Sequence, residues 1–147
     1  MPDMSQWNPA NCNCLALRQA ARHLTQYYDQ HMAAVGLRST QYSILSRLNR
    51  IGPMSINALA AAMVLDRTTL GRNMLPLERE GLIAIEPDAQ DRRSKALHLT
   101  RAGKAKLKAA MKCWEAAQRG FEASYGDVRS AQMREMMRAV VAAELPA

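Results

Sequence analysis

Apolar residues recur at intervals of three and four along most of the chain, and this spacing predicts α-helices. Small polar residues stand at the starts of several of these runs and glycines at their ends, as expected of helix caps and stops. Pro76 falls inside one predicted helix, where it removes the hydrogen bond to the Arg72 carbonyl and predicts a local kink or a tightened last turn. The predicted helices run from about Cys14 to Gly36; from a cap at Ser39 or Thr40 to Gly52; from a cap at Ser55 through Met63; from a cap at Asp66 to Gly81; from a cap at Thr100 to Gly126; and over a last stretch that carries Met133, Met137, Val140 and Val141.

The pattern changes between residues 82 and 99, where helical spacing is lost. Leu82 to Glu86 is short and partly β-branched, residues 87–94 are polar and turn-forming, and Lys95 to Leu99 alternates with a period of two. This combination predicts a β-hairpin with a long charged tip.

Four helices, a hairpin and two further helices predict a mainly α fold with a small β-hairpin wing. We interpret residues 39–99 as a winged helix-turn-helix lobe within a single domain of residues 1–147. The flanking segments 1–35 and 101–147 contain helices whose apolar stripes are more than so small a lobe can cover. The first dozen residues are polar and interrupted by proline, so we expect an arm there.

Composition narrows the choice of partners. The chain has 147 residues and a formal net charge of +7, which favours an anionic partner, although a solubilising surface explains the same charge. No apolar stretch of the roughly 18 residues that a membrane span needs is present, and no secretory signal is visible. The three cysteines are an odd number and do not suggest a disulfide framework. We therefore expect a cytoplasmic protein with no membrane partner, no cofactor and no enzymatic activity.

The outer face of the helix that follows Asp66 carries candidate DNA-reading side chains. With Leu70 turned to the core, steps of 100° per residue place hydroxyl and guanidinium groups on the opposite side. Arginine pairs with guanine, asparagine with adenine, and threonine with phosphate or the thymine methyl. An ordinary solvated helix face is the alternative interpretation. The outward set consists of Thr68, Thr69, Arg72, Pro76 and Arg79, with Asn73 at its edge and Ser55 and Arg67 as further DNA-binding candidates.

The tip of the predicted hairpin, Asp91-Arg92-Arg93-Ser94-Lys95, lies about ten residues after that helix. Two arginines on a protruding hairpin suit the narrow minor groove, where negative potential concentrates. We expect Asp91 to form a bidentate ion pair with one arginine and so direct the other outward. A solvated run of charges is the alternative.

Several segments together resemble the MarR family of bacterial regulators. They include residues 77–83, the Asp91-Arg92-Arg93-Ser94 run, residues 99–103, and the upstream segments 36–42 and 55–60. The resemblance implies a homodimer whose N- and C-terminal helices interlock. It further implies that the Asp66 to Glu80 helix enters a major groove of double-stranded DNA and that Arg92 or Arg93 enters the flanking minor groove. A two-fold dimer reads a roughly palindromic operator.

The same resemblance implies a repressor that a small effector, often an aromatic acid, releases from DNA. The implied cleft lies between the dimer helices and the lobe, and its candidate residues are Arg18, His23, Tyr28, His31 and Tyr42. A basic side chain there holds a carboxylate and a tyrosine contacts a ring, whereas ordinary packing of the tyrosines is the alternative.

Cys14 suggests a second kind of signal. It resembles the sensing cysteine of the organic-hydroperoxide regulators in the family, and Tyr28 matches one of the two tyrosines that activate that thiol. Ser39 stands where the second tyrosine is found, which argues against this function. Cys12 and Cys113 are possible resolving partners, and inert thiols are the alternative for all three cysteines.

Other function classes have less support in the sequence. A winged helix used only for protein contacts predicts an acidic or apolar outer face on the fourth helix, which the Thr68-Thr69-Arg72 surface is not. A thiol peroxidase needs a cysteine paired with a base, and no such local motif is found. The scattered histidines and the Cys12-x-Cys14 spacing do not predict a metal site.

Overall fold

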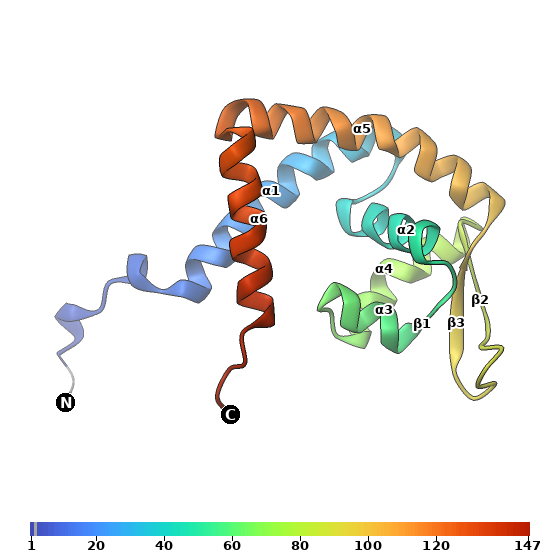
Figure 1. The fold of residues 1–147 in the computed structure, drawn as a ribbon, viewed down its shortest axis with the longest axis horizontal. Helices are drawn as coiled ribbons and strands as arrows, with labels where there is room; N and C mark the ends of the chain where they lie inside the picture. Colours follow the sequence, from blue (N-terminus) through green and yellow to red (C-terminus); the bar gives the residue numbers. More distant parts are fainter. Residues whose placement is uncertain (2) are drawn as a thin grey trace.

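A computed structural model describes Met1 and residues 3–147, and it is mainly helical with one small sheet (Figure 1). The helices are α1 (Asn13–Met32), α2 (Ser39–Ile51), α3 (Ile56–Met63), α4 (Arg67–Arg79), α5 (Arg101–Tyr125) and α6 (Asp127–Ala142). The strands are β1 (Met54–Ser55), β2 (Ile83–Pro87) and β3 (Lys95–Leu99). Short 3-10 helices cover Met4–Gln6, Pro9–Asn11 and Ala33–Val35.

Three of the predicted helix caps are confirmed. Ser55 Oγ accepts from the Ala58 amide at 3.0 Å, and Asp66 Oδ1 accepts from the Thr69 amide at 2.9 Å. Thr100 Oγ1 accepts from the Gly103 amide at 3.0 Å. Each oxygen thereby satisfies an amide that the first helical turn leaves without a partner.

The cap predicted for the second helix is wrong. Ser39 is already helical, and Arg38 is the N-cap residue. Gln41 Oε1 turns back to accept from the Arg38 amide at 2.9 Å, and Asp29 Oδ1 accepts from the Ser39 amide at 2.7 Å. Because these side chains satisfy the first amides, no hydroxyl cap from Ser39 or Thr40 is needed.

The sheet has three strands rather than the two of a simple hairpin. The strand order is β1-β3-β2, and Met54 of β1 lies opposite Leu97 of β3. A strand of two residues is too short to show alternation, so sequence spacing did not reveal it. Pro87, which we predicted to lie in the turn, is the last residue of β2 opposite Lys95. It is tolerated there because β2 is an edge strand.

The end of α4 shows how Pro76 is accommodated. The helix continues through Pro76 to Arg79, and the Gly81 amide then bonds the Glu78 carbonyl while the Leu82 amide bonds that of Leu77, both at 2.9 Å. Gly81 has a φ of 72°, as this type of helix end requires. The last turn is therefore tightened, which is one of the two outcomes predicted for this helix.

The core of the lobe joins the helices to the sheet. Leu45 of α2, Leu59 of α3, Leu70 of α4 and Leu97 of β3 are fully buried together. These side chains come from every layer of the lobe, so the orientation of α4 is fixed by the packing of the whole lobe.

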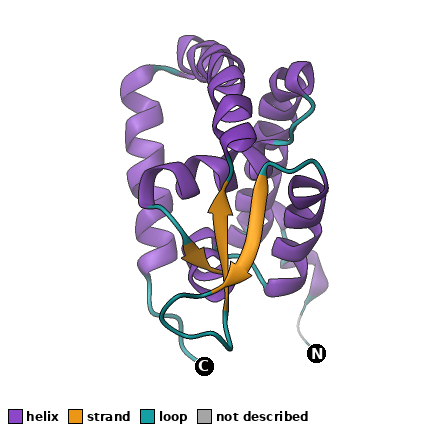
Figure 2. Ribbon diagram, turned by 90° about the vertical axis from the view of Figure 1, so that its right-hand side faces the viewer, coloured by secondary structure: helices purple, strands orange, loops and turns teal. Residues whose placement is uncertain are grey.

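Outside the lobe, α5 crosses the molecule on the side away from the tip of the wing, and α6 turns back from its far end (Figures 1 and 2). Most large apolar residues of α6 remain exposed, among them Val128, Met136, Val140 and Val141. None of the helices in the described part of the chain has the length and hydropathy of a membrane span.

Candidate nucleic-acid interface

The outer face of α4 is polar and accessible. Leu70, Met74 and Leu77 are buried, whereas the Thr68 and Arg72 side chains on the opposite side are exposed. Arg72 therefore points away from the protein interior. Leu75, which is not among the predicted DNA-binding residues, is also half-exposed.

Two of the predicted DNA-reading residues are engaged within α4 itself. Asn73 Nδ2 donates to the Thr69 carbonyl at 2.9 Å. The Thr69 hydroxyl, followed by the Thr69 amide, holds the pKa of the Asp66 carboxyl below its ordinary value, and Arg72 adds to this effect. Thr69 thus serves the cap of the helix, and Arg67 and Arg72 are the exposed cationic side chains of its first two turns.

The expected ion pair of Asp91 is not formed. Asp91 Oδ1 accepts from the Arg93 amide at 3.0 Å, and Oδ2 accepts from the Ser94 hydroxyl at 3.4 Å. Within the described residues, neither Arg92 nor Arg93 forms an ion pair with it. The short carboxylate reaches the amide two residues ahead and fixes the turn. Both guanidinium groups therefore remain exposed.

The wing and the helix-turn-helix meet at one basic hollow of about 230 Å³. Arg67 at the start of α4 lies on one side of it, and Arg93 and Lys95 of the wing lie on the other. The N-terminus of α3 adds backbone donors of the kind that bind phosphate. The remaining lining residues are Ser55, Ile56, Asn57 and Ser94.

Asn57 also lines the hollow, and it is not among the predicted DNA-binding residues. It stands two positions after the Ser55 cap, in the first turn of α3. This position next to a helix N-terminus could have indicated a DNA-contacting residue from the sequence. The basic residues at the start of α5 lie on a helix that passes on the opposite side of the lobe from the tip of the wing (Figure 1). They are therefore not part of the surface formed by α3, α4 and the wing.

The five predicted effector residues do not form one cluster within the chain. Arg18 and His23 are exposed on α1. The Tyr28 hydroxyl donates to Gln118 Oε1 on α5, and His31 Nδ1 lies 3.0 Å from the Tyr27 carbonyl. Burial is the main cause that raises the pKa of Tyr28 above its ordinary value.

Tyr42 has the surroundings of a binding residue. Its ring lies nearly parallel to that of Trp114 on α5, with centroids 6.4 Å apart, and burial raises the pKa of its hydroxyl. The two rings border a cavity of about 540 Å³ that Arg47 and Arg50 of α2 also line. These two arginines stand three positions apart on the exposed side of α2, a spacing that could have been found in the sequence.

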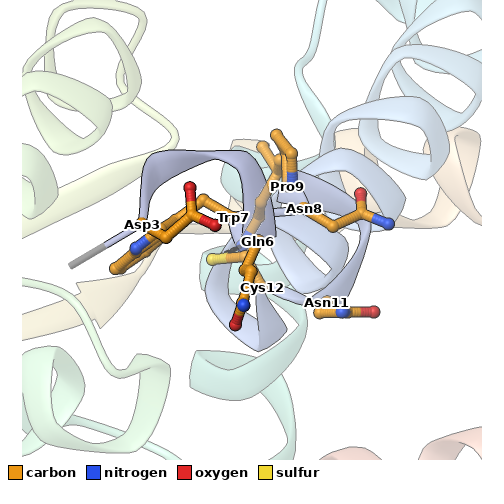
Figure 3. Close-up of a pocket in the computed structure, with 8 residues that line it drawn as sticks. Asp3, Gln6, Trp7, Asn8, Pro9, Asn11 and Cys12 are labelled. Atoms are coloured by element: carbon orange, nitrogen blue, oxygen red, sulfur yellow. Dashed lines mark hydrogen bonds between the residues drawn. The ribbon is translucent and has the colours of Figure 1, made fainter.

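The cysteines are all free thiols, with Cys12 and Cys14 exposed and Cys113 half-buried. Cys12 Sγ accepts from the Leu15 amide at 3.4 Å and so caps α1. It also lines a cavity of about 770 Å³ in the N-terminal arm beside Trp7 (Figure 3). Cys14 and Tyr28 stand 14 positions apart on one helix, which separates them by roughly 21 Å, so they do not meet within a chain.

A helix-turn-helix with an exposed arginine face, beside a three-stranded wing with two exposed arginines, defines the class of winged-helix DNA-binding proteins. The model of the MarR family matches residues 37–95, from just before α2 to the first residue of β3. The chain belongs to the MarR family and is a DNA-binding transcription regulator.

Relatives that match most of the chain agree with this assignment. The transcriptional activatory protein BadR of Rhodopseudomonas palustris is 32% identical over 81% of this chain and 66% of its own length. The HTH-type transcriptional repressor NicR of Pseudomonas putida is 30% identical over 79% of this chain and 72% of its own. The M. tuberculosis regulator MosR, solved in complex with DNA, is 34% identical with a TM-score of 0.77 and covers 92% of this chain and all of its own.

Proposed function

We propose that the protein is a homodimeric repressor that binds a palindromic operator and is released by a small aromatic acid. The observation that carries the DNA-binding geometry is the shared hollow, in which Arg67 of α4 and Arg93 of the wing line one surface. An arginine-bearing helix and an arginine-tipped wing on one side of the lobe are able to contact adjacent grooves of one duplex.

The residues of this surface divide into two roles. Arg72 and Thr68, exposed on the outer face of α4, read base edges, with Asn73 and Arg79 beside them. Arg92 enters the minor groove. Phosphate is held by the remaining members, which lie at the hollow or cap its helices: Ser55, Asn57, Arg67, Thr69, Arg93, Ser94 and Lys95, with Asp91 fixing the turn.

The dimer follows from the apolar surface of the flanking segments, 1–35 and 101–147. Val128, Met136, Val140 and Val141 of α6 are exposed in the single chain, as is Trp7 of the arm. Exposed apolar residues gathered on one element indicate a surface that another chain covers. A two-fold pair presents two copies of α4, which is why we propose a palindromic site.

The effector site is the cavity between α2 and α5. Tyr42 and Trp114 provide aromatic walls, and Arg47 and Arg50 provide charge for a carboxylate. Its volume of about 540 Å³ falls in the range of small-ligand sites. We also propose that Arg18 and His23 of a partner protomer, exposed on α1, contribute further polar contacts.

The test is selection of preferred sequences from a randomised duplex library, followed by binding titrations and measurement of the mass of the complex. We expect an inverted repeat with half-sites about one helical turn apart and two chains per duplex. An aromatic carboxylate such as benzoate should weaken that binding, and its amide should not. The proposal is refuted by the absence of any enriched sequence, or by a single chain on an asymmetric site.

A further inference from the structure

One large apolar side chain of α4 lies outside the core of the lobe. Leu75 is 50% exposed, whereas the other leucines and the methionine of this helix, Leu70, Met74 and Leu77, are buried. A single exposed leucine is common on protein surfaces, so the exposure of Leu75 alone indicates no function. The informative observation is its position relative to the DNA-reading residues.

Leu75 lies on the same side of α4 as the proposed base-reading residues. It stands seven positions after Thr68, which is close to two full turns of an α-helix. It is also three positions after Arg72 and four positions before Arg79, the spacings at which side chains share one helix face. These three polar residues are all exposed. Leu75 therefore continues the DNA-reading surface and stands between its two arginines.

The chemistry of leucine limits what it is able to contact on DNA. Its side chain has neither a hydrogen-bond donor nor an acceptor, so it gains nothing from a phosphate and displaces water from that charge without a compensating bond. In the major groove, the apolar group on the edges of the base pairs is the C5 methyl of thymine. A leucine placed against that methyl removes both groups from water. The arginines on either side remain free to bind bases or phosphates.

We infer that Leu75 is a specificity-determining residue that recognises the C5 methyl of a thymine in each half-site of the operator. The inference rests on the proposed function, in which the outer face of α4 reads base edges. Leu75 lies about 4.5 Å further along the helix axis than Arg72, which is between one and two base-pair steps of about 3.4 Å. The thymine should therefore lie within about two base pairs of the base that Arg72 contacts.

A contact with the thymine methyl also distinguishes cytosine from 5-methylcytosine. The added methyl group is bonded to the same ring carbon as that of thymine, and it projects into the same groove. Leu75 gains the same apolar contact from a methylated cytosine at this position. We therefore expect that C5 methylation of a cytosine placed there strengthens binding.

The test is the replacement of each thymine of the selected operator by deoxyuridine, one position at a time and in both half-sites together. The replacement removes the methyl group and keeps every hydrogen-bond donor and acceptor of the base pair. We expect one position at which deoxyuridine weakens binding about fifteenfold, because one buried methyl contact contributes about fourfold in each half-site. At that position, 5-methylcytosine should bind more tightly than cytosine by about the same factor. Fluorescence anisotropy measures these affinities.

Leu75→Ala removes the side chain that makes the contact. The site is exposed and alanine favours the helix, so the variant should remain folded, which urea unfolding checks. Its affinities for the thymine and deoxyuridine duplexes should differ by less than about twofold. Met111→Ala is the matched control, because Met111 is 46% exposed on α5, which passes on the opposite side of the lobe from the wing tip. This control should retain the deoxyuridine effect of about fifteenfold.

Thr68→Ser separates Leu75 from the neighbouring residue that also has a methyl group. It removes the threonine methyl and keeps the hydroxyl, so the deoxyuridine effect assigned to Leu75 should persist. The inference is overturned if Thr68→Ser abolishes the effect and Leu75→Ala retains it. It is equally overturned if no thymine position responds in the parent protein.

These results are distinguishable from failure of the proposed function. Selective binding to the operator with no methyl effect that depends on Leu75 refutes the inference alone. Absence of any selected sequence refutes the proposed function, and with it the base reading by α4.

Discussion

Replacing Arg93 by glutamine removes one positive charge from the wing and leaves the turn intact. The turn depends on the Arg93 amide, which donates to Asp91 Oδ1 at 3.0 Å, and not on the guanidinium group. The guanidinium is exposed, so the free energy of unfolding should change by less than about 0.5 kcal/mol. Any change in DNA binding is then a property of the interface.

The expected magnitude follows from counterion release. Each phosphate contact contributes about 0.9 to the slope of log affinity against log salt, so a dimer that loses two contacts loses about 1.8 from the slope. When the salt concentration rises fourfold, from 50 to 200 mM, both proteins lose affinity for DNA. The factor by which the parent loses affinity should be about twelve times the factor for the variant. Fluorescence anisotropy on a labelled duplex at several salt concentrations measures this slope.

Lys108→Gln is the matched control. It removes the same charge from an exposed position of α5, on the side of the lobe away from the wing tip. The net charge of the two variants is equal, so a general electrostatic effect changes both slopes alike. If Arg93→Gln and Lys108→Gln give the same slope, the wing arginine makes no phosphate contact and the proposed geometry is wrong.

Further predictions concern base reading and stability. Arg72→Gln should keep the salt slope and reduce the difference in binding free energy between a selected and a scrambled duplex by about 1–3 kcal/mol per lost base contact. An equal loss of affinity on both duplexes contradicts base reading. Leu70→Ala empties a fully buried site of α4 and should cost about 2–5 kcal/mol in urea unfolding. Thr100→Ala removes the cap of α5 and the hydroxyl bond to the Gly81 carbonyl, and should cost about 1–2 kcal/mol in the same assay. Asp66 has a lowered pKa, so its contribution to stability is complete above its ordinary pKa of 3.8 and is lost as the pH falls through the lower folded value. Asp66→Asn should remove this loss of stability at acid pH. An unchanged dependence of the free energy of unfolding on pH would contradict the cap.

The gap between sequence and structure is clearest at the wing. The sequence placed Arg92 and Arg93 at the tip of a hairpin, because polar turn residues between two short β segments have few other solutions. It did not reveal β1 or the role of Asp91. A two-residue strand has no period, and a carboxylate next to arginines chooses between an ion pair and a local amide bond according to the exact path of the backbone.

The effector residues show a similar limit. Tyr42 was predicted from the resemblance, and its stacking on Trp114 depends on the crossing of α2 and α5, which are more than sixty residues apart in the chain. Arg47, Arg50 and Arg138 appear as solvated charges in the sequence. Only the arrangement of α2, α5 and α6 in space places them around cavities.

The elements and their faces could be predicted from the residues alone: the helical stripes, three caps, the stop at Gly81 and the outward position of Arg72. These depend on contacts within a few residues, so spacing alone reveals them. Which faces meet depends on the three-dimensional packing, which brings Arg67 and Arg93 to one hollow and places Val64 at a cavity that Val141 of α6 also lines. Such contacts join residues distant in sequence, and the packing of the buried core fixes them.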